Sequence, residues 1–165
     1  MKKNAQAWGF DLMMAVVIFT LGLVLFFLYS INYPRQSEET LDALKYEGDF
    51  IAESLLSEGH PANWIPADAV RIGITNQEKI NQTKLERLYS MAANPSGYAA
   101  SKSIFNTRYE YFFNLSIPII INSQPIPEGG IGKDFQNQNT QNIIKVTRLA
   151  IYQDKPVTLN LYIWE

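Results

Sequence analysis

The chain has 165 residues, a formal net charge of −2 and a sequence pI near 5.5, with no basic run, which argues against a nucleic-acid-binding surface. Cysteine is absent, so no disulfide can support an exported domain, and packing, glycan or neighbouring subunits must stabilise it. Beyond an apolar N-terminal segment, the length leaves room for one small domain with its own core.

The chain begins with a short basic leader that runs into a long apolar segment. The leader carries Lys2, Lys3 and the small residue Ala5, and the acidic Asp11 lies at the head of the apolar helix. The following segment, Leu12–Ile31, has no charged side chain. As an α-helix rising about 1.5 Å per residue it spans roughly 30 Å, the depth of a hydrocarbon core. Apolar residues occur on every side, so this helix must lie in lipid or be surrounded by protein.

Two interpretations of the apolar segment stay open. A cleaved secretory signal would have a shorter apolar region that ends in small residues, whereas this one ends in Tyr29, Ser30 and Ile31. A permanent membrane anchor and a helix that leaves the membrane to form the core of an assembly both fit. Basic residues precede the segment and acidic residues follow it, so the positive-inside rule predicts a cytoplasmic amino terminus and an exported head.

The leader resembles the class III signal peptide of type IV pilins, in particular that of archaeal pilins and archaellins. In that family a membrane peptidase cuts before the apolar helix, which is retained. The resemblance implies a cut between Ala5 and Gln6, with Gly9 and Phe10 as the alternative. Asn4 departs from the family pattern, which usually has a charged residue or glycine there. The implied parts are a leader of residues 1–5, a transmembrane and filament-core helix of residues 6–33, and an extracellular head of residues 34–165.

The resemblance also implies contacts for assembly. The family's early acidic residue pairs with the amino terminus of a neighbouring subunit, a role that falls on Asp11; a carboxylate at the membrane interface, favoured by the helix dipole, is the alternative. Ala15, Thr20 and Gly22 would allow close helix approach without a strict GxxxG, or are ordinary lipid-facing residues. The expected membrane and assembly residues are Asp11, Leu12, Ala15, Thr20, Gly22, Leu28 and Ile31.

Two amphipathic helices are predicted in the head. Tyr29 and Tyr33 mark the far membrane interface, and Pro34 breaks the apolar helix. Ser37 reads as the N-cap of a helix to about Ser57, stopped by Gly59. A loop that Trp64 seals onto the core follows. A second helix, Gln82 to about Ala92, is capped by Asn81 and ended by turn chemistry at residues 94–97.

The rest of the head is predicted as strands. Residues 109–117 alternate as a half-buried strand that Pro118 places at an edge, at a bulge or near its end. Residues 122–142 read as a loop. Strands at 143–152 and 157–164, joined by residues 153–156, form a hairpin that resembles the carboxyl-terminal hairpin of archaeal pilin-like proteins, with Arg148 and Trp164. The expected fold class is α+β: a long hydrophobic N-terminal helix projecting from a small head with amphipathic helices and an antiparallel β-sheet.

The functional expectation is assembly without catalysis. No nucleophile with a base and no metal-ligand spacing occurs, and the single His60 is weak evidence for either, so we expect no enzyme, metal or cofactor. Asn114 and Asn81 lie in glycosylation motifs. We expect a structural subunit of a type IV pilus-like extracellular filament with a role in adhesion or surface attachment. Its partners would be other copies, the membrane, the prepilin peptidase and the assembly platform. The alternative is a permanently anchored extracytoplasmic binding or accessory protein that does not polymerise.

Overall fold

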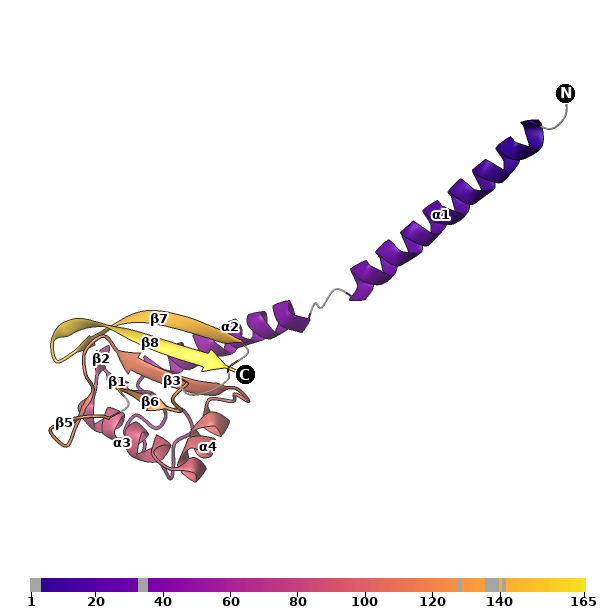
Figure 1. Ribbon diagram of the computed structural model, residues 1–165. Helices are drawn as coiled ribbons and strands as arrows, with labels where there is room; N and C mark the ends of the chain where they lie inside the picture. Colours follow the sequence, from indigo (N-terminus) through magenta and orange to yellow (C-terminus); the bar gives the residue numbers. More distant parts are fainter. Residues whose placement is uncertain (1–3, 33–35, 128, 136–139, 141) are drawn as a thin grey trace. The chain divides into compact units, whose positions relative to one another are not determined.

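The computed structural model describes residues 4–32, 36–127, 129–135, 140 and 142–165 (Figure 1). The chain divides into two compact units, Met1–Glu38 and Glu39–Glu165. The first contains helix α1 (Asn4–Asn32), and the second is a head that mixes helices and strands. The α+β class is therefore confirmed. The predicted roles of Lys2, Lys3, Tyr33 and Pro34, and residues 128, 136–139 and 141 of the predicted loop, fall outside the described residues.

Helix α2 (Gln36–Leu55) opens the head and matches the predicted amphipathic helix. It begins before Ser37, so that serine lies inside the helix and not at its N-cap. Leu44, Ile51 and Leu55 on its inner face are fully buried. Gly59 follows with φ of +76°, a left-handed conformation that suits glycine after a helix end.

Helix α3 (Gln82–Ala92) matches the second predicted helix, and the Asn81 side chain caps it by accepting a hydrogen bond from Lys84 N. The predicted turn after it was wrong. Asn94 instead caps a further helix, α4 (Pro95–Ile104), because its Oδ1 accepts from Gly97 N at 2.7 Å and proline fits the first helical turn. Asparagine, proline, serine and glycine occur both in turns and at helix starts. Here the packing of Tyr98 against the strand favours the helix over the turn.

The main sheet has six strands in the order β1-β2-β7-β8-β3-β6, and a separate pair, β4-β5, lies beside it. All neighbours are antiparallel except β2 and β7, which run parallel. The strands are β1 (Thr75–Asn76), β2 (Lys79–Ile80), β3 (Glu110–Leu115), β4 (Ile120–Ile121), β5 (Gln124–Pro125), β6 (Gly130–Gly132), β7 (Ile143–Tyr152) and β8 (Lys155–Trp164).

The hairpin β7-β8 confirms the strongest strand prediction, with a tighter turn than expected. Gln153 and Asp154 have φ of 51° and 59°, so the loop has two residues and Lys155 and Pro156 already belong to β8. The inward set of β8, from Val157 to Ile163, is buried as its alternation predicted. Strand β3 ends at Leu115, short of Pro118, as the proline prediction required.

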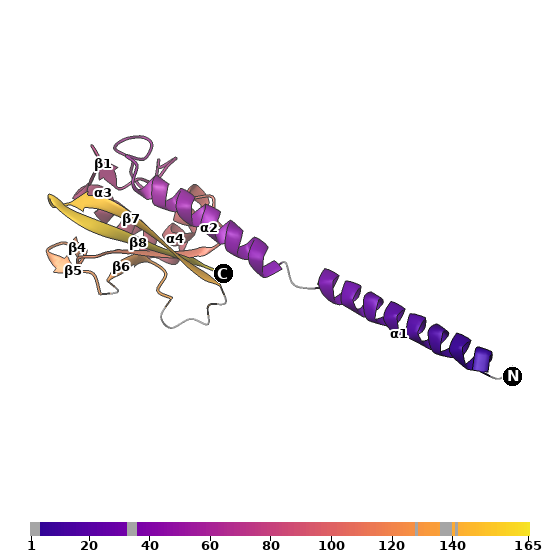
Figure 2. The ribbon, with the colours of Figure 1, turned by 90° about the horizontal axis from the view of Figure 1, so that it is seen from above.

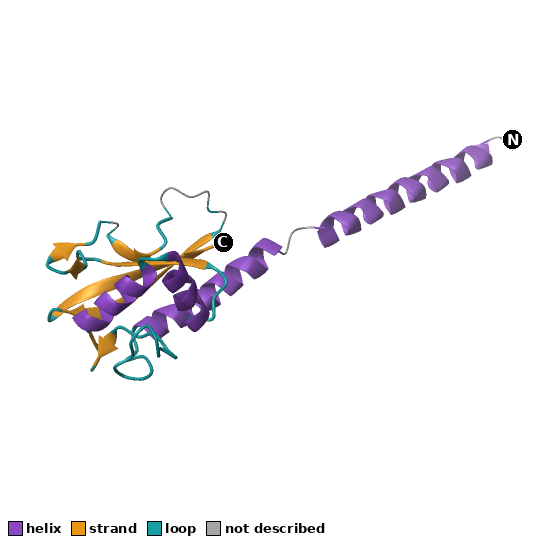
Figure 3. Ribbon diagram, turned by 90° about the horizontal axis from the view of Figure 1, so that it is seen from below, coloured by secondary structure: helices purple, strands orange, loops and turns teal. Residues whose placement is uncertain are grey.

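Helices α2, α3 and α4 cover one face of the sheet, and the core lies between these helices and the sheet (Figures 2 and 3). Helix α2 approaches the sheet at Gly48, where an added Cβ would lie 3.0 Å from Val146 Cγ2 and 3.1 Å from Ile163 Cγ2. Helix α4 packs through Tyr98, whose ring stacks on that of Tyr111 at a centroid distance of 5.1 Å. The predicted loop at 122–142 was partly wrong, because it contains β5 and β6.

Strand β6 pairs with β3 because its residues are small. A Cβ on Gly130 would lie 2.3 Å from the Phe112 ring, and one on Gly132 would lie 2.3 Å from the carbonyl oxygen of Tyr111. On the face of the sheet away from the helices, Phe112 joins Phe135, Tyr162 and Trp164 in an aromatic cluster. Both faces of the sheet centre are therefore covered, which explains why Trp164 is buried although its strand neighbours on that face are half-exposed.

Candidate assembly helix and head cleft

Helix α1 has an apolar surface that no other described part of the chain covers. Its residues Gly9–Ile31 form a stretch of 23 residues with mean hydropathy 2.6, and none of that stretch is buried. Phe10, Leu12 and Phe19 are 63%, 66% and 69% exposed. A helix of this length and composition is able to cross a membrane, because its backbone hydrogen bonds are satisfied internally.

The predicted processing residues lie at the start of α1. Ala5 and Gln6 belong to its first turns, and Gly9 and Phe10 follow one turn later, so both predicted cuts fall in helical backbone. Asp11 is the single charged residue between Gly9 and Ile31. Because α1 begins at Asn4, Asp11 lies beyond the first turn, where the helix dipole has faded. The helix dipole therefore does not explain Asp11 in the uncut chain.

The small residues of α1 do not all lie together. Asp11, Ala15 and Gly22 share one stripe, since positions four apart differ by about 40° around a helix and positions seven apart by about 20°. A Cβ added at Gly22 would meet no atom within 4 Å, so its own chain gives no packing reason for glycine. Thr20 lies on another side, and its Oγ1 donates to Val16 O at 2.8 Å. Leu28 and Ile31 are exposed apolar residues near the end of the helix.

The two glycosylation motifs occupy different settings in the head. Asn114 lies on β3 and, as predicted, faces away from the apolar set; it is half-buried, and its Oδ1 accepts from Asn160 Nδ2 at 3.1 Å. Asn81 is the cap of α3. His60 is exposed in the loop after α2. Within the described ranges, no group of three or more His, Cys, Asp or Glu residues could hold a metal ion.

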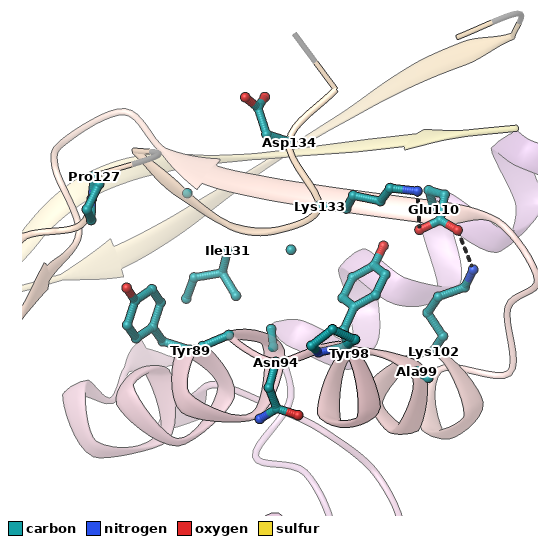
Figure 4. A pocket seen from close by; sticks show the side chains of 15 residues that line it. Tyr89, Asn94, Tyr98, Ala99, Lys102, Glu110, Pro127, Ile131, Lys133 and Asp134 are labelled. Carbon is teal, nitrogen blue, oxygen red and sulfur yellow. Dashed lines mark hydrogen bonds and ion pairs between the residues drawn. The ribbon is translucent and has the colours of Figure 1, made fainter. Parts of the chain in front are cut away.

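A cleft of about 650 Å³ lies between β6 and the junction of α3 with α4 (Figure 4). Tyr89 and Tyr98 line its helical side and Ile131 its sheet side. The Tyr98 hydroxyl accepts from Tyr111 N at 2.9 Å and donates to Tyr111 O at 3.2 Å, which fixes α4 to the strand. Burial raises the pKa of Tyr98 well above its ordinary value.

One end of the cleft is a group of charges around Glu110. Its Oε1 accepts from Lys102 Nζ at 3.0 Å, and Oε2 lies 3.6 Å from Lys133 Nζ. Partial burial acts to raise the pKa of Glu110, but the Lys102 hydrogen bond and both cations outweigh it and leave the pKa below its ordinary value. Glu110 is therefore ionised at neutral pH and is not poised to donate a proton.

The cleft has a size common for small-ligand sites, but its charges do not favour a strongly charged ligand. Lys102 and Lys133 are balanced by Glu110 and Asp134. Sequence reasoning missed this cleft because it read residues 94–97 as a turn. The signal was the spacing of Asn94, Tyr98 and Lys102, which places one side chain per turn along a helix face.

Comparison of the chain with protein-family models, with curated proteins and with solved structures found no match.

Proposed function

We propose that the chain is a structural subunit of a type IV pilus-like extracellular filament, held in the membrane before assembly by α1. Two observations together carry this proposal: the apolar stretch Gly9–Ile31 is wholly exposed, and the head has a buried core of its own. Such a stretch cannot stay in water: full exposure of one large apolar side chain costs roughly 1.5–3 kcal/mol, and this segment has many.

The helix can exchange lipid for protein without changing its fold. Its backbone hydrogen bonds are internal, so either apolar surrounding is tolerated. The stripe of Asp11, Ala15 and Gly22 offers one side on which a neighbouring helix can approach closely. In this proposal the membrane peptidase removes the leader, an assembly platform extracts the subunit, and the head adheres to a surface. The rival is a permanent anchor that carries a binding or accessory head.

The mature amino terminus and the state of the cell-surface material separate these functions. A protein that begins at Gln6 or Phe10 and that is found in sheared filaments supports the subunit. An intact Met1 with all protein in the membrane fraction supports the permanent anchor, and absence of the apolar helix from the finished protein would overturn both.

Asp11→Ala tests the pairing of Asp11 with a neighbouring subunit. We expect unchanged membrane insertion and reduced incorporation into filaments. Asp42→Ala on the exposed side of α2 is the matched control, because it removes the same charge outside the apolar stretch. Equal incorporation of the Asp11 and Asp42 variants would exclude the pairing.

A further inference from the structure

The cleft between β6 and the junction of α3 with α4 has mainly apolar walls. Tyr89 and Tyr98 line its helical side, Ile131 lies opposite them, and Pro127 borders it. Figure 4 shows Tyr89 at one end of the cleft, Lys133 at the other end and Ile131 between them. Apolar and aromatic walls with a few polar groups are typical of ligand sites.

Side chains that can donate hydrogen bonds to a ligand lie at the two ends of the cleft. Tyr89 is half-buried, and within the described part of the chain its hydroxyl makes no hydrogen bond. Lys133 is exposed, and its Nζ makes only a long ion pair, 3.6 Å, with Glu110 Oε2. An ammonium group has three donors and no acceptor, and a phenol hydroxyl donates one hydrogen bond. A ligand in the cleft therefore meets a donor at each end.

The side-chain acceptors around the cleft do not face a ligand. Glu110 Oε1 accepts from Lys102 Nζ at 3.0 Å, and Glu110 Oε2 is buried from solvent. Figure 4 shows the Asp134 carboxylate and the Asn94 amide pointing away from the cleft. An N–H or O–H group of a ligand that turned toward these walls would lose its hydrogen bonds to water without replacement, which costs free energy. The cleft therefore favours a ligand that presents acceptors and no donors.

We propose that the cleft binds a proline-rich peptide segment of another protein in the polyproline II conformation. Proline has no backbone N–H, so such a segment presents carbonyl acceptors without donors. Prolyl rings dock in aromatic-lined grooves, a role that falls here on Tyr89 and Tyr98. Carbonyl oxygens of the segment accept from the Tyr89 hydroxyl and from Lys133 Nζ. The segment is uncharged, in keeping with the balanced charges of the lining.

Both partners are ordered before they meet. The Tyr98 hydroxyl exchanges two hydrogen bonds with the backbone of Tyr111, and the two rings stack, so the helical wall is fixed to the sheet. The opposite wall is fixed because β6 pairs with β3. A polyproline II segment is already extended in the free peptide, so its binding loses little conformational entropy.

An oligosaccharide matches the cleft less well. Each sugar hydroxyl donates as well as accepts a hydrogen bond, and the donated bonds would find no free side-chain acceptor among the described lining residues. In an exported head, the peptide site would supply the contact through which the filament adheres to a protein on another surface. That step rests on the proposed function, whereas the binding of the peptide does not.

A nuclear magnetic resonance titration of the full chain in detergent micelles with a capped hexaproline peptide tests the binding. We expect a dissociation constant of about 1 mM or tighter. A capped glycine-serine peptide of the same length has backbone N–H groups and no preformed helix, and it should bind at least about tenfold more weakly. Maltotriose, a neutral saccharide, should not bind.

Two pairs of variants locate the binding. Tyr89→Phe removes the donor and keeps the ring, so it should weaken hexaproline binding about threefold to tenfold. Tyr46→Phe is its control, because Tyr46 is 76% exposed on α2 and does not line the cleft. Ala99→Trp fills the cleft from α4 and should weaken binding at least about tenfold. Ala100→Trp, at an exposed position of the same helix outside the cleft, should leave it unchanged.

Absence of hexaproline binding at about 10 mM would overturn the proposal, and so would equal affinities for hexaproline and the glycine-serine peptide. Equal affinity of Tyr89→Phe and Tyr46→Phe, or of Ala99→Trp and Ala100→Trp, would also overturn it. Binding of maltotriose in place of hexaproline would assign the cleft to a saccharide. Filament formation is assayed separately on sheared material. Filaments whose subunits do not bind hexaproline would exclude the peptide site alone, and hexaproline binding by a chain confined to the membrane fraction would exclude the filament alone.

Discussion

Trp64 Nε1 donates a hydrogen bond to the carbonyl oxygen of Gly73 at 2.8 Å, deep in the head. The Trp64 side chain is fully buried, as its predicted role in sealing the loop onto the core required. The loop closes tightly around it: a Cβ on Gly59 would lie 2.7 Å from Trp64 Cδ1, and one on Gly73 would lie 2.2 Å from Ser57 O. The indole thus fixes the connection between α2 and β1.

Trp64→Phe should lower the free energy of unfolding of the head by about 2–4 kcal/mol, because it leaves a cavity and a buried carbonyl without its donor. Urea unfolding of the full chain in micelles, followed by circular dichroism, measures this. Ile65→Ala, at a neighbouring exposed side chain, should change the value by less than about 0.5 kcal/mol. A Trp64→Phe variant as stable as the Ile65→Ala variant would contradict the role of the indole.

Gly48 allows α2 to lie close against β7 and β8. Gly48→Ala should be nearly neutral, since the gain in helix propensity of about 1 kcal/mol offsets the contacts with Val146 and Ile163 near 3 Å. Gly48→Leu has no room and should destabilise the head by at least about 1–3 kcal/mol. The same urea experiment compares the two, and equal stability would show that α2 can move away from the sheet without cost.

The elements that the sequence predicted are those whose signal is local. Helices α2 and α3 and the hairpin β7-β8 each have a period of burial that can be read from consecutive residues, and the apolar stretch is recognised by its length without a charge after Asp11. Alternation in β8 predicted its inward face correctly because one face packs on helices and the other does not.

The elements that the sequence did not predict depend on contacts between residues that lie far apart in the chain. Helix α4 starts with residues that also make turns, and Tyr98 holds it by hydrogen bonds to Tyr111. Strand β6 has two glycines in three residues and forms because Phe112 and Tyr111 leave room only for glycine there. Since the cleft lies between α4 and β6, it could not be predicted once both were missed.

Raising the pH above about 10 should destabilise the head. Burial raises the pKa of Tyr98 and Tyr111 above the ordinary 10.0, so the unfolded chain loses these protons first. The two protonated tyrosines contribute fully to the free energy of unfolding below pH 10.0. This contribution is lost as the pH rises toward the pKa values of the folded state. Burial lowers the pKa of Lys84, which acts in the opposite direction but involves a single group. Free energies of unfolding between pH 8 and 11 should fall less steeply for Tyr98→Phe than for the unsubstituted protein.

Acid should weaken the charge group at the end of the cleft. The pKa of Glu110 is below its ordinary 4.5, so its contribution is present above that pH and is lost as the pH falls through the lower folded value. Below pH 4.5 the free energy of unfolding should therefore fall less steeply with pH in Glu110→Gln than in the unsubstituted protein. Asp154→Asn is the matched control, because the exposed pair of Asp154 with Lys79 is screened by solvent. If both variants reduced the pH dependence of the free energy of unfolding equally, Glu110 would contribute no more to it than the exposed Asp154 does.

Gly22 tests whether close helix approach, and not lipid contact alone, governs α1. A Cβ at this position meets nothing of its own chain, so Gly22→Leu should leave folding and membrane insertion unchanged. In a filament it would push apart helices that approach along the stripe of Asp11, Ala15 and Gly22, and the yield of sheared filaments should fall. Thr20→Leu adds bulk on another side of the helix and should reduce the yield less. Equal filament yields for Gly22→Leu and the unsubstituted protein would show that neighbouring α1 helices do not contact one another through this stripe.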